Sequence, residues 1–234
     1  MNTPQKNIGQ LEYNFFKPFG PTIARYKLPD VIFDILSNLT DEILSHENRV
    51  SMGANLAGQI AEEPAIPTQS LRETGLEQVF EQCVRHYVKQ FYDAHNNQDG
   101  EYDIIDAEIK SCWVVSQYEN EYNPAHYHPG CTISAVLYLK LPDKTPRNIP
   151  GKLDLDGCIQ WLNHSNVPGT LDAGTYTCTP EVGSLYMFPS HLLHTVYPFQ
   201  GSGERRSVSF NASHNLREIS EPSRPDNQGD IISG

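Results

Sequence analysis

The segment NPAHYHPGCTISAVLYLKLP, residues 123–142, places His126 and His128 two positions apart, follows them with Pro129 and Gly130, and continues as an alternating apolar run. In a strand, residues i and i+2 project from the same face, about 6.5–7 Å apart along the chain. The two imidazoles would therefore point the same way and could bind one metal ion near the strand end. The alternative is a surface strand that carries two solvated histidines.

A second segment, GSLYMFPSHLLHTVYPFQGSGERRSVSFN at residues 183–211, supplies candidates for a third ligand. Its pattern indicates a strand, a turn, a second strand, a hairpin and a third strand. His194 opens the strand HTVYPF, and His191 lies three residues earlier, after Phe-Pro-Ser. Antiparallel strands bring sequence-remote residues to one point. We expect His194 to be the ligand and His191 to lie in the turn.

Arg205, Arg206 and Ser207 follow the hairpin. On an alternating strand, Arg205 and Ser207 face one way and Arg206 faces the other. An inward arginine inside a closed barrel is unfavourable unless it has an anionic partner, and its planar guanidinium suits a carboxylate. We expect Arg205 to face inward, one hairpin after a candidate metal ligand. The alternative is an outward Arg205 in a surface ion pair.

The periodicity of the chain changes from helical to strand-like near residue 104. Upstream, an edge strand is predicted within PTIARYKLP (21–29), followed by a helix from Val31, a loop over 51–70, and a second helix from Leu76 to Phe91. Downstream, short strands separated by Pro, Gly and Asn clusters predict a sandwich or barrel. These strands are expected near residues 105–118, 124–128, 132–141, 151–156, 175–179, 183–188, 194–199 and 205–212.

This pattern predicts a mainly β fold with flanking helices, in which the N-terminal helices pack on one outer face of a jelly-roll core. We divide the chain into a helical extension (1–103), the β core (104–214) and a polar, Pro- and Gly-rich flexible tail (215–234). The helical face and the tail could each support a homodimer.

Composition excludes some classes of protein. The net charge of −12 argues against general binding to nucleic acids or anionic membranes, which are themselves negative. No apolar run approaches the roughly 18–20 residues that a membrane span requires, and the N-terminus lacks a signal-peptide core. The five cysteines are odd in number and scattered, as is typical of reduced thiols, so we expect a cytoplasmic protein.

Other polar and aromatic side chains have ordinary structural interpretations. Glu62 and Glu63 are expected on a solvated face, and Trp113 in the core or at its rim. Gln117 and Asn211 could line the pocket or bond the backbone.

The sequence resembles the Fe(II)- and 2-oxoglutarate-dependent oxygenases, and in particular a branch of small bacterial and phage members with a His-x-His-Pro motif. The resemblance rests on HYHPGCTISAVLYL, GSLYMFPSHLLHTVYP and ERRSVSFN, in that order, and covers about residues 105–212. It implies a double-stranded β-helix, a cupin-like jelly roll. It also implies Fe(II) and 2-oxoglutarate as cofactor and cosubstrate.

Position by position, the resemblance implies that His126, His128 and His194 bind the metal. His128 stands where most of the superfamily has aspartate or glutamate. Three neutral imidazoles would leave the ion more positive than the usual two histidines and one carboxylate. Three hypotheses stay open: His128 is itself the ligand, a carboxylate such as Asp154 or Asp156 replaces it, or the site holds Zn(II).

The resemblance further implies that Arg205 and Ser207 hold the far carboxylate of 2-oxoglutarate, and that Tyr138 donates a hydrogen bond to it. The implied activity is hydroxylation by O₂, with release of succinate and CO₂, of a small-molecule or peptidyl substrate. Two alternatives from other classes are a cupin-like three-histidine metalloenzyme that needs no 2-oxoglutarate, and a non-catalytic jelly-roll binding module.

Overall fold

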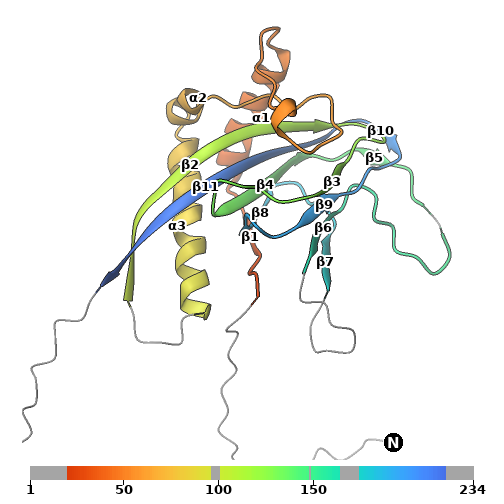
Figure 1. Ribbon diagram of the computed structural model, residues 1–234. Coiled ribbons are helices and arrows are strands. Elements are labelled where there is room, and N and C mark those ends of the chain that lie inside the picture. The colour runs from red at the N-terminus through yellow and green to blue at the C-terminus, as the bar shows by residue number, and fades with distance from the viewer. Residues whose placement is uncertain (1–19, 96–100, 148, 164–173, 220–234) are drawn as a thin grey trace, which may run out of the picture.

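The computed structural model describes residues 20–95, 101–147, 149–163 and 174–219. Two antiparallel sheets and a layer of helices make up this part of the chain (Figure 1). The larger sheet has the strand order β1-β8-β4-β11-β2 and the smaller sheet the order β3-β9-β6-β7, and β5 and β10 form a separate ribbon. The fold is that of a double-stranded β-helix with helices on one face, as the sequence predicts.

The elements follow one another along the chain as helices first and strands afterwards. The helical elements are α1 (Asp30–Ser45), the 3₁₀ turn η1 (Gly53–Asn55), α2 (Thr68–Glu73) and α3 (Leu76–His95). The strands are β1 (Ala24–Lys27), β2 (Glu101–Gln117), β3 (Asn123–His126), β4 (Ile133–Lys140), β5 (Asp143–Lys144), β6 (Ile159–Leu162), β7 (Thr175–Cys178), β8 (Ser184–Pro189), β9 (His194–Val196), β10 (Gly201–Ser202) and β11 (Arg205–Ile219).

The helices cover the outer face of the larger sheet because α1 and α3 each carry an apolar stripe. Phe80 of α3 is fully buried and stacks on Phe210 of β11, with ring centroids 4.6 Å apart. The central strands of the larger sheet, β4 and β8, are buried on both faces. The helices cover one face of this sheet, and the smaller sheet covers the other. There Tyr138, Trp161 and Phe188 form a second apolar cluster between the sheets.

A further extended segment continues the larger sheet beyond β2. Backbone hydrogen bonds run from Ser116 N to Glu62 O and from Val114 N to Pro64 O, at 2.9 Å each. The other side of this segment is held by Met52 N, which donates to Glu63 O at 2.8 Å. The predicted loop over 51–70 is therefore largely ordered, and it includes η1 and the start of α2.

The prediction was wrong over residues 151–156, which form no strand. Asp154 Oδ1 accepts a hydrogen bond from Asp156 N at 3.0 Å, and Gly151 and Gly157 have positive φ, so this stretch turns repeatedly. The strand follows at β6. The predicted tail begins inside β11, which continues to Ile219. Residues 220–234 lie outside the described residues.

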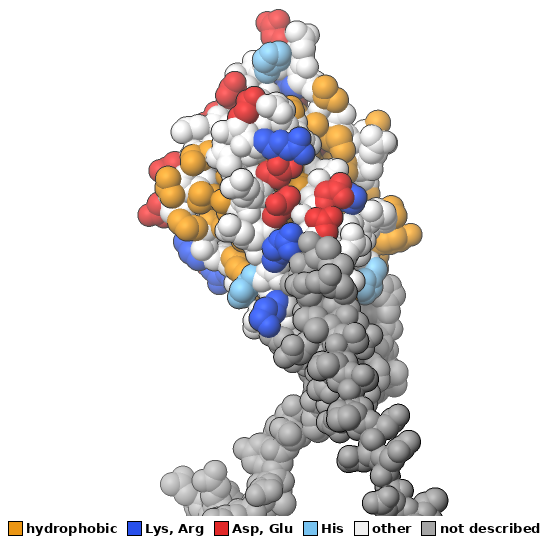
Figure 2. All heavy atoms as spheres, turned by 90° about the vertical axis from the view of Figure 1, so that its left-hand side faces the viewer, with side chains coloured by type: hydrophobic (Ala, Val, Ile, Leu, Met, Phe, Trp, Pro, Cys, Tyr) orange, Lys and Arg blue, Asp and Glu red, His pale blue; other side chains and the backbone are white. Residues whose placement is uncertain are grey.

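On the face that Figure 2 shows, acidic and basic side chains alternate near the centre and hydrophobic side chains are scattered around them. Among the described helices, none has the length and apolar character needed to cross a bilayer.

Candidate metal centre and cosubstrate site

Strand pairing brings the predicted histidines together. His126 ends β3 and His194 opens β9, and these two residues lie directly opposite each other in the antiparallel register. His128 lies two residues past β3, where its backbone N–H donates to Ser190 O at 2.9 Å. The structure thus places a sequence-local pair and a residue 66 positions further on at one point.

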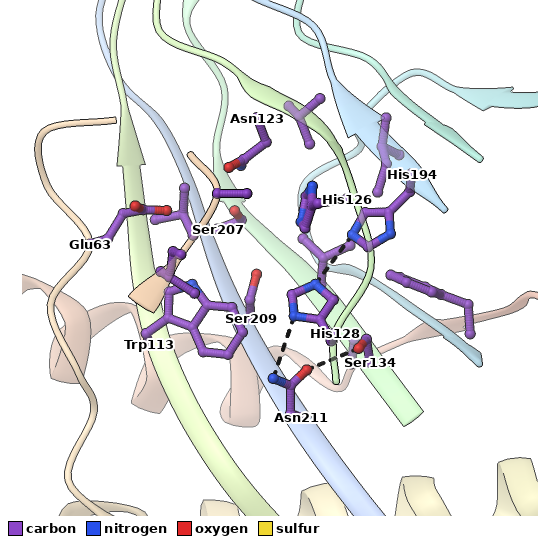
Figure 3. A pocket seen from close by; sticks show the side chains of 18 of the residues that line it. Glu63, Trp113, Asn123, His126, His128, Ser134, His194, Ser207, Ser209 and Asn211 are labelled. Carbon is purple, nitrogen blue, oxygen red and sulfur yellow. Dashed lines mark hydrogen bonds between the residues drawn. The ribbon is translucent and has the colours of Figure 1, made fainter. Parts of the chain in front are cut away.

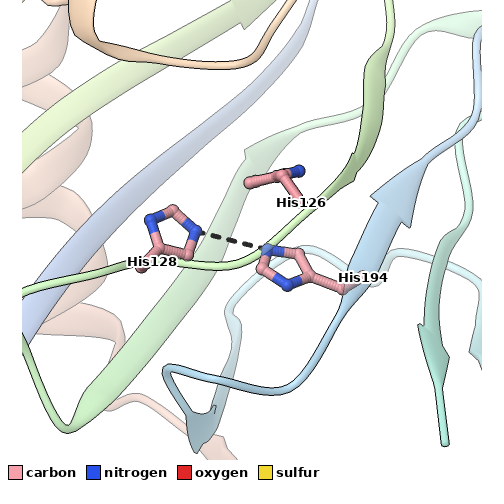
Figure 4. Close-up of side chains that lie close together, drawn as sticks. All are labelled: His126, His128 and His194. Atoms are coloured by element: carbon pink, nitrogen blue, oxygen red, sulfur yellow. Dashed lines mark hydrogen bonds between the residues drawn. The ribbon is translucent and has the colours of Figure 1, made fainter. Parts of the chain in front are cut away.

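The three imidazoles are arranged as metal ligands would be. One ring nitrogen from each lies within 4.8 Å of those of the other two (Figure 4). His128 Nε2 and His194 Nε2 are 3.3 Å apart. Two nitrogens bound at about 2.1 Å to one ion, at about 100° to each other, would be about 3.2 Å apart. The donor set and its spacing fit a metal ion.

Backbone carbonyls orient two of the rings. His126 Nδ1 lies 2.7 Å from Pro124 O, and His194 Nδ1 lies 2.9 Å from Leu192 O. A carbonyl can only accept, so each Nδ1 carries the ring proton. The lone pair of each ring is therefore on Nε2. Such partners are the usual means by which a protein fixes the tautomer of a metal-binding histidine.

Asn211 and Ser134 contact the third ring. Asn211 Nδ2 lies 3.5 Å from His128 Nδ1, and Ser134 Oγ donates to Asn211 Oδ1 at 2.9 Å (Figure 3). In this orientation the His128 proton sits on Nε2 and points at His194. A half-turn of the amide exchanges its oxygen and nitrogen. Asn211 then accepts the proton on His128 Nδ1, and Nε2 is free to bind a metal.

Burial keeps all three histidines neutral. It lowers the pKa of His126, lowers the pKa of His128 to about 4, and lowers the pKa of His194 to about 3, with the neighbouring His126 adding to the last two shifts. Neutral imidazoles are the form that binds metals, so protons do not compete for this site near neutral pH.

The alternative ligands lie elsewhere. Asp156 forms an ion pair with Arg147 at 2.9 Å and accepts a hydrogen bond from Gln200 N, while Asp154 bonds the backbone of Asp156. Within the described ranges, the group of potential ligands comprises only the three histidines. His191 is exposed and faces a separate hollow beside α3.

Arg205 is buried in the same cavity as the histidines, which its side chain lines together with Ser207. Its side chain donates from Nε to Gly157 O at 3.1 Å and from Nη1 to Gln117 Oε1 at 3.0 Å. Its guanidinium carbon lies 4.9 Å from the ring centroid of Tyr138. None of these neighbours is an anion, and burial lowers the pKa of Arg205.

Two buried polar atoms have no hydrogen-bond partner among the described residues: Arg205 Nη2 at the cavity, and the hydroxyl of Tyr138, which lies behind Arg205 and does not itself line the cavity. Both can donate, and burial raises the pKa of Tyr138 to about 12, so its proton is retained. A buried cation beside an unused phenol is a site for a carboxylate. The residues present therefore fit the far carboxylate of 2-oxoglutarate.

The adjacent Arg206 shows how a buried arginine in this protein is paired when carboxylates are within reach. It faces the helices, where it pairs with Glu204 at 2.6 Å and with Asp41. The adjacent arginines are both buried, yet only the outward one has carboxylate partners. As predicted from the alternation of the strand, the two guanidinium groups lie on opposite faces of the sheet.

Sequence reasoning missed several polar residues of the cavity, among them Glu63. Glu63 was expected on a solvated face, but it is 2 % exposed and lines the cavity with the histidines, whereas its neighbour Glu62 faces outward and pairs with Arg49. Trp113, also buried, lines the same cavity. No local signal separates Glu62 from Glu63, because the pairing with β2 decides which of them faces inward.

Residues 111–211 match the family described as "Putative 2OG-Fe(II) oxygenase". No curated protein sequence matches the chain at a significant level. The match contains all six residues expected at the metal and cosubstrate sites, and it favours an oxygenase over the cupin-like and binding-module alternatives.

Solved structures share the fold at low sequence identity. A prolyl-4-hydroxylase from Pseudomonas putida superposes with a TM-score of 0.50 at 14% identity, covering 82% of this chain and 93% of the other. A prolyl hydroxylase from Trichoplax adhaerens, solved with a hypoxia inducible factor peptide fragment, gives 0.51 at 14% identity, covering 83% of each chain. The epimerase SnoN of nogalamycin biosynthesis gives 0.52 at 12% identity, covering 82% and 76%. Residues 111–211 thus match the 2OG-Fe(II) oxygenase family, and the chain shares the fold of these solved structures.

Proposed function

We propose that His126, His128 and His194 hold Fe(II), that Arg205, Ser207 and Tyr138 hold 2-oxoglutarate, and that the enzyme hydroxylates its substrate. One observation carries the cosubstrate assignment. Arg205 is 1 % exposed, its guanidinium has no anionic partner among the described residues, and the residue lines the cavity that the three histidines line. An unpaired buried cation requires an anionic ligand.

The side chains would bind and orient the reactants. Iron and 2-oxoglutarate supply the oxidative chemistry, in which substrate C–H, 2-oxoglutarate and O₂ give C–OH, succinate and CO₂. His126 and His194 present Nε2 because backbone carbonyls hold their Nδ1 protons. Arg205 fixes the cosubstrate at its far end, and its bonds to Gly157 and Gln117 prevent the guanidinium from turning away. Phe188 packs against His194, at 4.8 Å between centroids, and keeps water from that side.

The charge of the donor set has a consequence for the choice of metal. Three neutral imidazoles leave a divalent ion its full charge, whereas two histidines and a carboxylate reduce that charge by one. The three-histidine set also suits Zn(II). We therefore propose Fe(II) as the native metal with Zn(II) as its strongest competitor.

The test uses the purified protein under anaerobic conditions with Fe(II) and 2-oxoglutarate. We expect a visible charge-transfer band on addition of 2-oxoglutarate, and slow succinate formation on admission of air. Arg205→Ala should lose the band at 2-oxoglutarate concentrations that saturate the wild type, while it keeps the metal. If Arg205→Ala keeps wild-type affinity for 2-oxoglutarate, the proposed cosubstrate site is wrong.

Arg206→Ala is the matched control, since it removes the adjacent buried arginine on the other face of β11. It should keep the affinity for 2-oxoglutarate but lose about 2 kcal/mol of unfolding free energy, because the carboxylate of Glu204 loses its main partner. The two variants are compared by their affinity for 2-oxoglutarate, which only Arg205→Ala should lower. Equal losses of that affinity would contradict this assignment of roles.

Location and organisation are also proposals. We propose a cytoplasmic enzyme, supported by five free cysteines and a cavity that needs a reduced metal. The division into residues 1–103, 104–214 and 215–234 stays a prediction, as does a homodimer. Part of each outer division lies outside the described residues.

A further inference from the structure

Four buried polar atoms border or approach the cavity without a hydrogen-bond partner among the described residues, and the cosubstrate explains only two of them. Arg205 Nη2 and the Tyr138 hydroxyl are assigned above to 2-oxoglutarate. The others are Glu63 Oε2 and Trp113 Nε1. Because buried polar atoms in folded proteins nearly always have partners, the second pair calls for its own ligand.

The position of Glu63 is fixed by its backbone. On one side the neighbouring residues bond to β2, and on the other Glu63 O accepts from Met52 N. Figure 3 shows the carboxylate and the three histidines facing each other across the cavity. This carboxylate is thus built into a wall, directly opposite the proposed metal.

Close packing holds the carboxylate in this wall. A Cβ atom added at Gly58 would lie 3.1 Å and 3.2 Å from the two carboxylate oxygens, and 2.5 Å from Asn123 Oδ1. Glycine at this position leaves room for both side chains. The arrangement therefore brings a bare carboxylate and an amide to one spot beside Trp113.

The electrostatics around Glu63 favour a cationic ligand. Burial and the negative charge of Glu121 raise the pKa of Glu63 to about 7. Glu121 is itself held by the backbone N–H groups of Ala61 and Tyr118. Over the described ranges, neither carboxylate has a lysine or arginine partner. A positive group would restore the charge of Glu63 and relieve its repulsion with Glu121.

Trp113 adds a second element of recognition. Its ring lies beside His128, with centroids 6.0 Å apart, so that it forms the floor between Glu63 and the histidines. An indole face attracts cations, and its free N–H can donate to an oxygen next to the cationic group. Both features suit a ligand with a positive nitrogen.

We propose that Glu63 and Trp113 form the substrate-recognition site, and that the substrate carries a cationic nitrogen group, an ammonium or a guanidinium. This inference rests on the proposed function, since it places the substrate opposite the three histidines. The cavity then has an anion site at Arg205 and a cation site at Glu63. The cationic group anchors the substrate, so that a carbon atom next to it faces the metal.

The experiment measures binding to the anaerobic enzyme loaded with Fe(II) and 2-oxoglutarate, by calorimetry. The probes are N-acetyl-lysine methylamide and N-acetyl-arginine methylamide, each paired with its neutral counterpart, the norleucine or the citrulline derivative. We expect at least one cationic probe to bind about tenfold or more tightly than its counterpart. Glu63→Gln should abolish this preference.

Glu62→Gln is the matched control, because the neighbouring carboxylate faces outward and pairs with Arg49. It should keep the preference. The proposal is overturned if neither cationic probe is preferred by the wild type, or if Glu63→Gln keeps the preference. The charge-transfer band with 2-oxoglutarate, unchanged in Glu63→Gln, separates this result from failure of the oxygenase assignment itself.

Discussion

Asn211 decides which nitrogen of His128 carries the proton. Removing it with Asn211→Ala leaves Nδ1 of His128 without a side-chain partner, so the ring loses the amide that, after the half-turn described above, accepts the Nδ1 proton. We expect the affinity for Fe(II) to fall by about 10–100-fold, as is usual when a residue that orients a metal-binding histidine is lost. Competition for Fe(II) against a chromophoric chelator measures this affinity.

Ser209→Ala is the control for this prediction, since it removes a nearby polar group from the same face of β11 without a bond to His128. Its metal affinity should match the wild type. Wild-type affinity in Asn211→Ala would mean that backbone contacts alone orient the ring.

Glu63 gives the fold a particular dependence on pH. Its pKa is about 7 in the folded protein against an ordinary value of 4.5, so the folded protein keeps a proton that the unfolded chain releases. Stability from this group therefore falls as the pH rises from about 4.5 to about 7 and stays lower above that. Glu63→Gln should remove the fall and gain on the order of 2 kcal/mol at alkaline pH.

Urea unfolding at several pH values checks this result. At about pH 4 the variant and the wild type should have nearly equal stability, because both then carry a neutral side chain. Parallel pH profiles for the two proteins would contradict the prediction. Glu62→Gln changes the outward-facing neighbour and should have the same dependence of stability on pH as the wild type.

At the scale of elements, the hairpin before β11 depends on one glycine. Gly201 has φ +137°, and a Cβ atom there would lie 2.1 Å from the backbone oxygen of Asp143 in the paired strand. Gly201→Ala should therefore push β10 away from β5. We expect it to lower the free energy of unfolding by about 2 kcal/mol or more, as measured by thermal or urea unfolding. Since β11 begins with Arg205 just beyond this ribbon, affinity for 2-oxoglutarate should fall too.

Gly203→Ala is the fitting comparison, because its φ is also positive, at +89°, while the nearest atom to an added Cβ is 3.7 Å away. Gly203→Ala should therefore cause backbone strain without a clash between the added Cβ atom and the paired strand. Its loss of unfolding free energy should be smaller than that of Gly201→Ala. A larger loss at Gly203 than at Gly201 would count against the close approach of the two strands.

The elements also show what the sequence could predict. The period of two set Arg205 and Arg206 on opposite faces, because that inference needs only the local geometry of a strand. It also predicted that His126 and His128 lie together, but β3 ends at His126, and His128 is held beyond the strand by its backbone bond to Ser190. The strand predicted at 151–156 was wrong, since Asp154 and the flanking glycines form turns instead. Glu63 was missed because its burial depends on pairing with β2, some fifty residues further along the chain.

For the whole molecule, the helices and the sheet should unfold together. Phe80 of α3 is fully buried against Phe210 of β11, so the layer of helices shares its core with the strand that carries Arg205. We expect Phe80→Ala to lose about 3–5 kcal/mol and still unfold in one transition. Far- and near-ultraviolet circular dichroism should give the same midpoint.

Val31→Ala, at a residue of α1 that is 62 % exposed, should change the stability by less than about 0.5 kcal/mol. If the helical signal of Phe80→Ala is lost at a lower urea concentration than the tertiary signal, the helices and the β core are separate folding units. The N-terminal 103 residues would then be an independent layer.

With His126 and His194 as the proposed ligands, their direct opposition makes metal binding a test of correct assembly. A slip of β9 by a single residue would turn its imidazole to the other side of the smaller sheet. Such a misassembled chain would lack the full chelate and remain without iron. Metal binding would thus stabilise only those newly made chains whose strands have the correct register. Cells starved of iron should therefore degrade the enzyme faster than cells with sufficient iron.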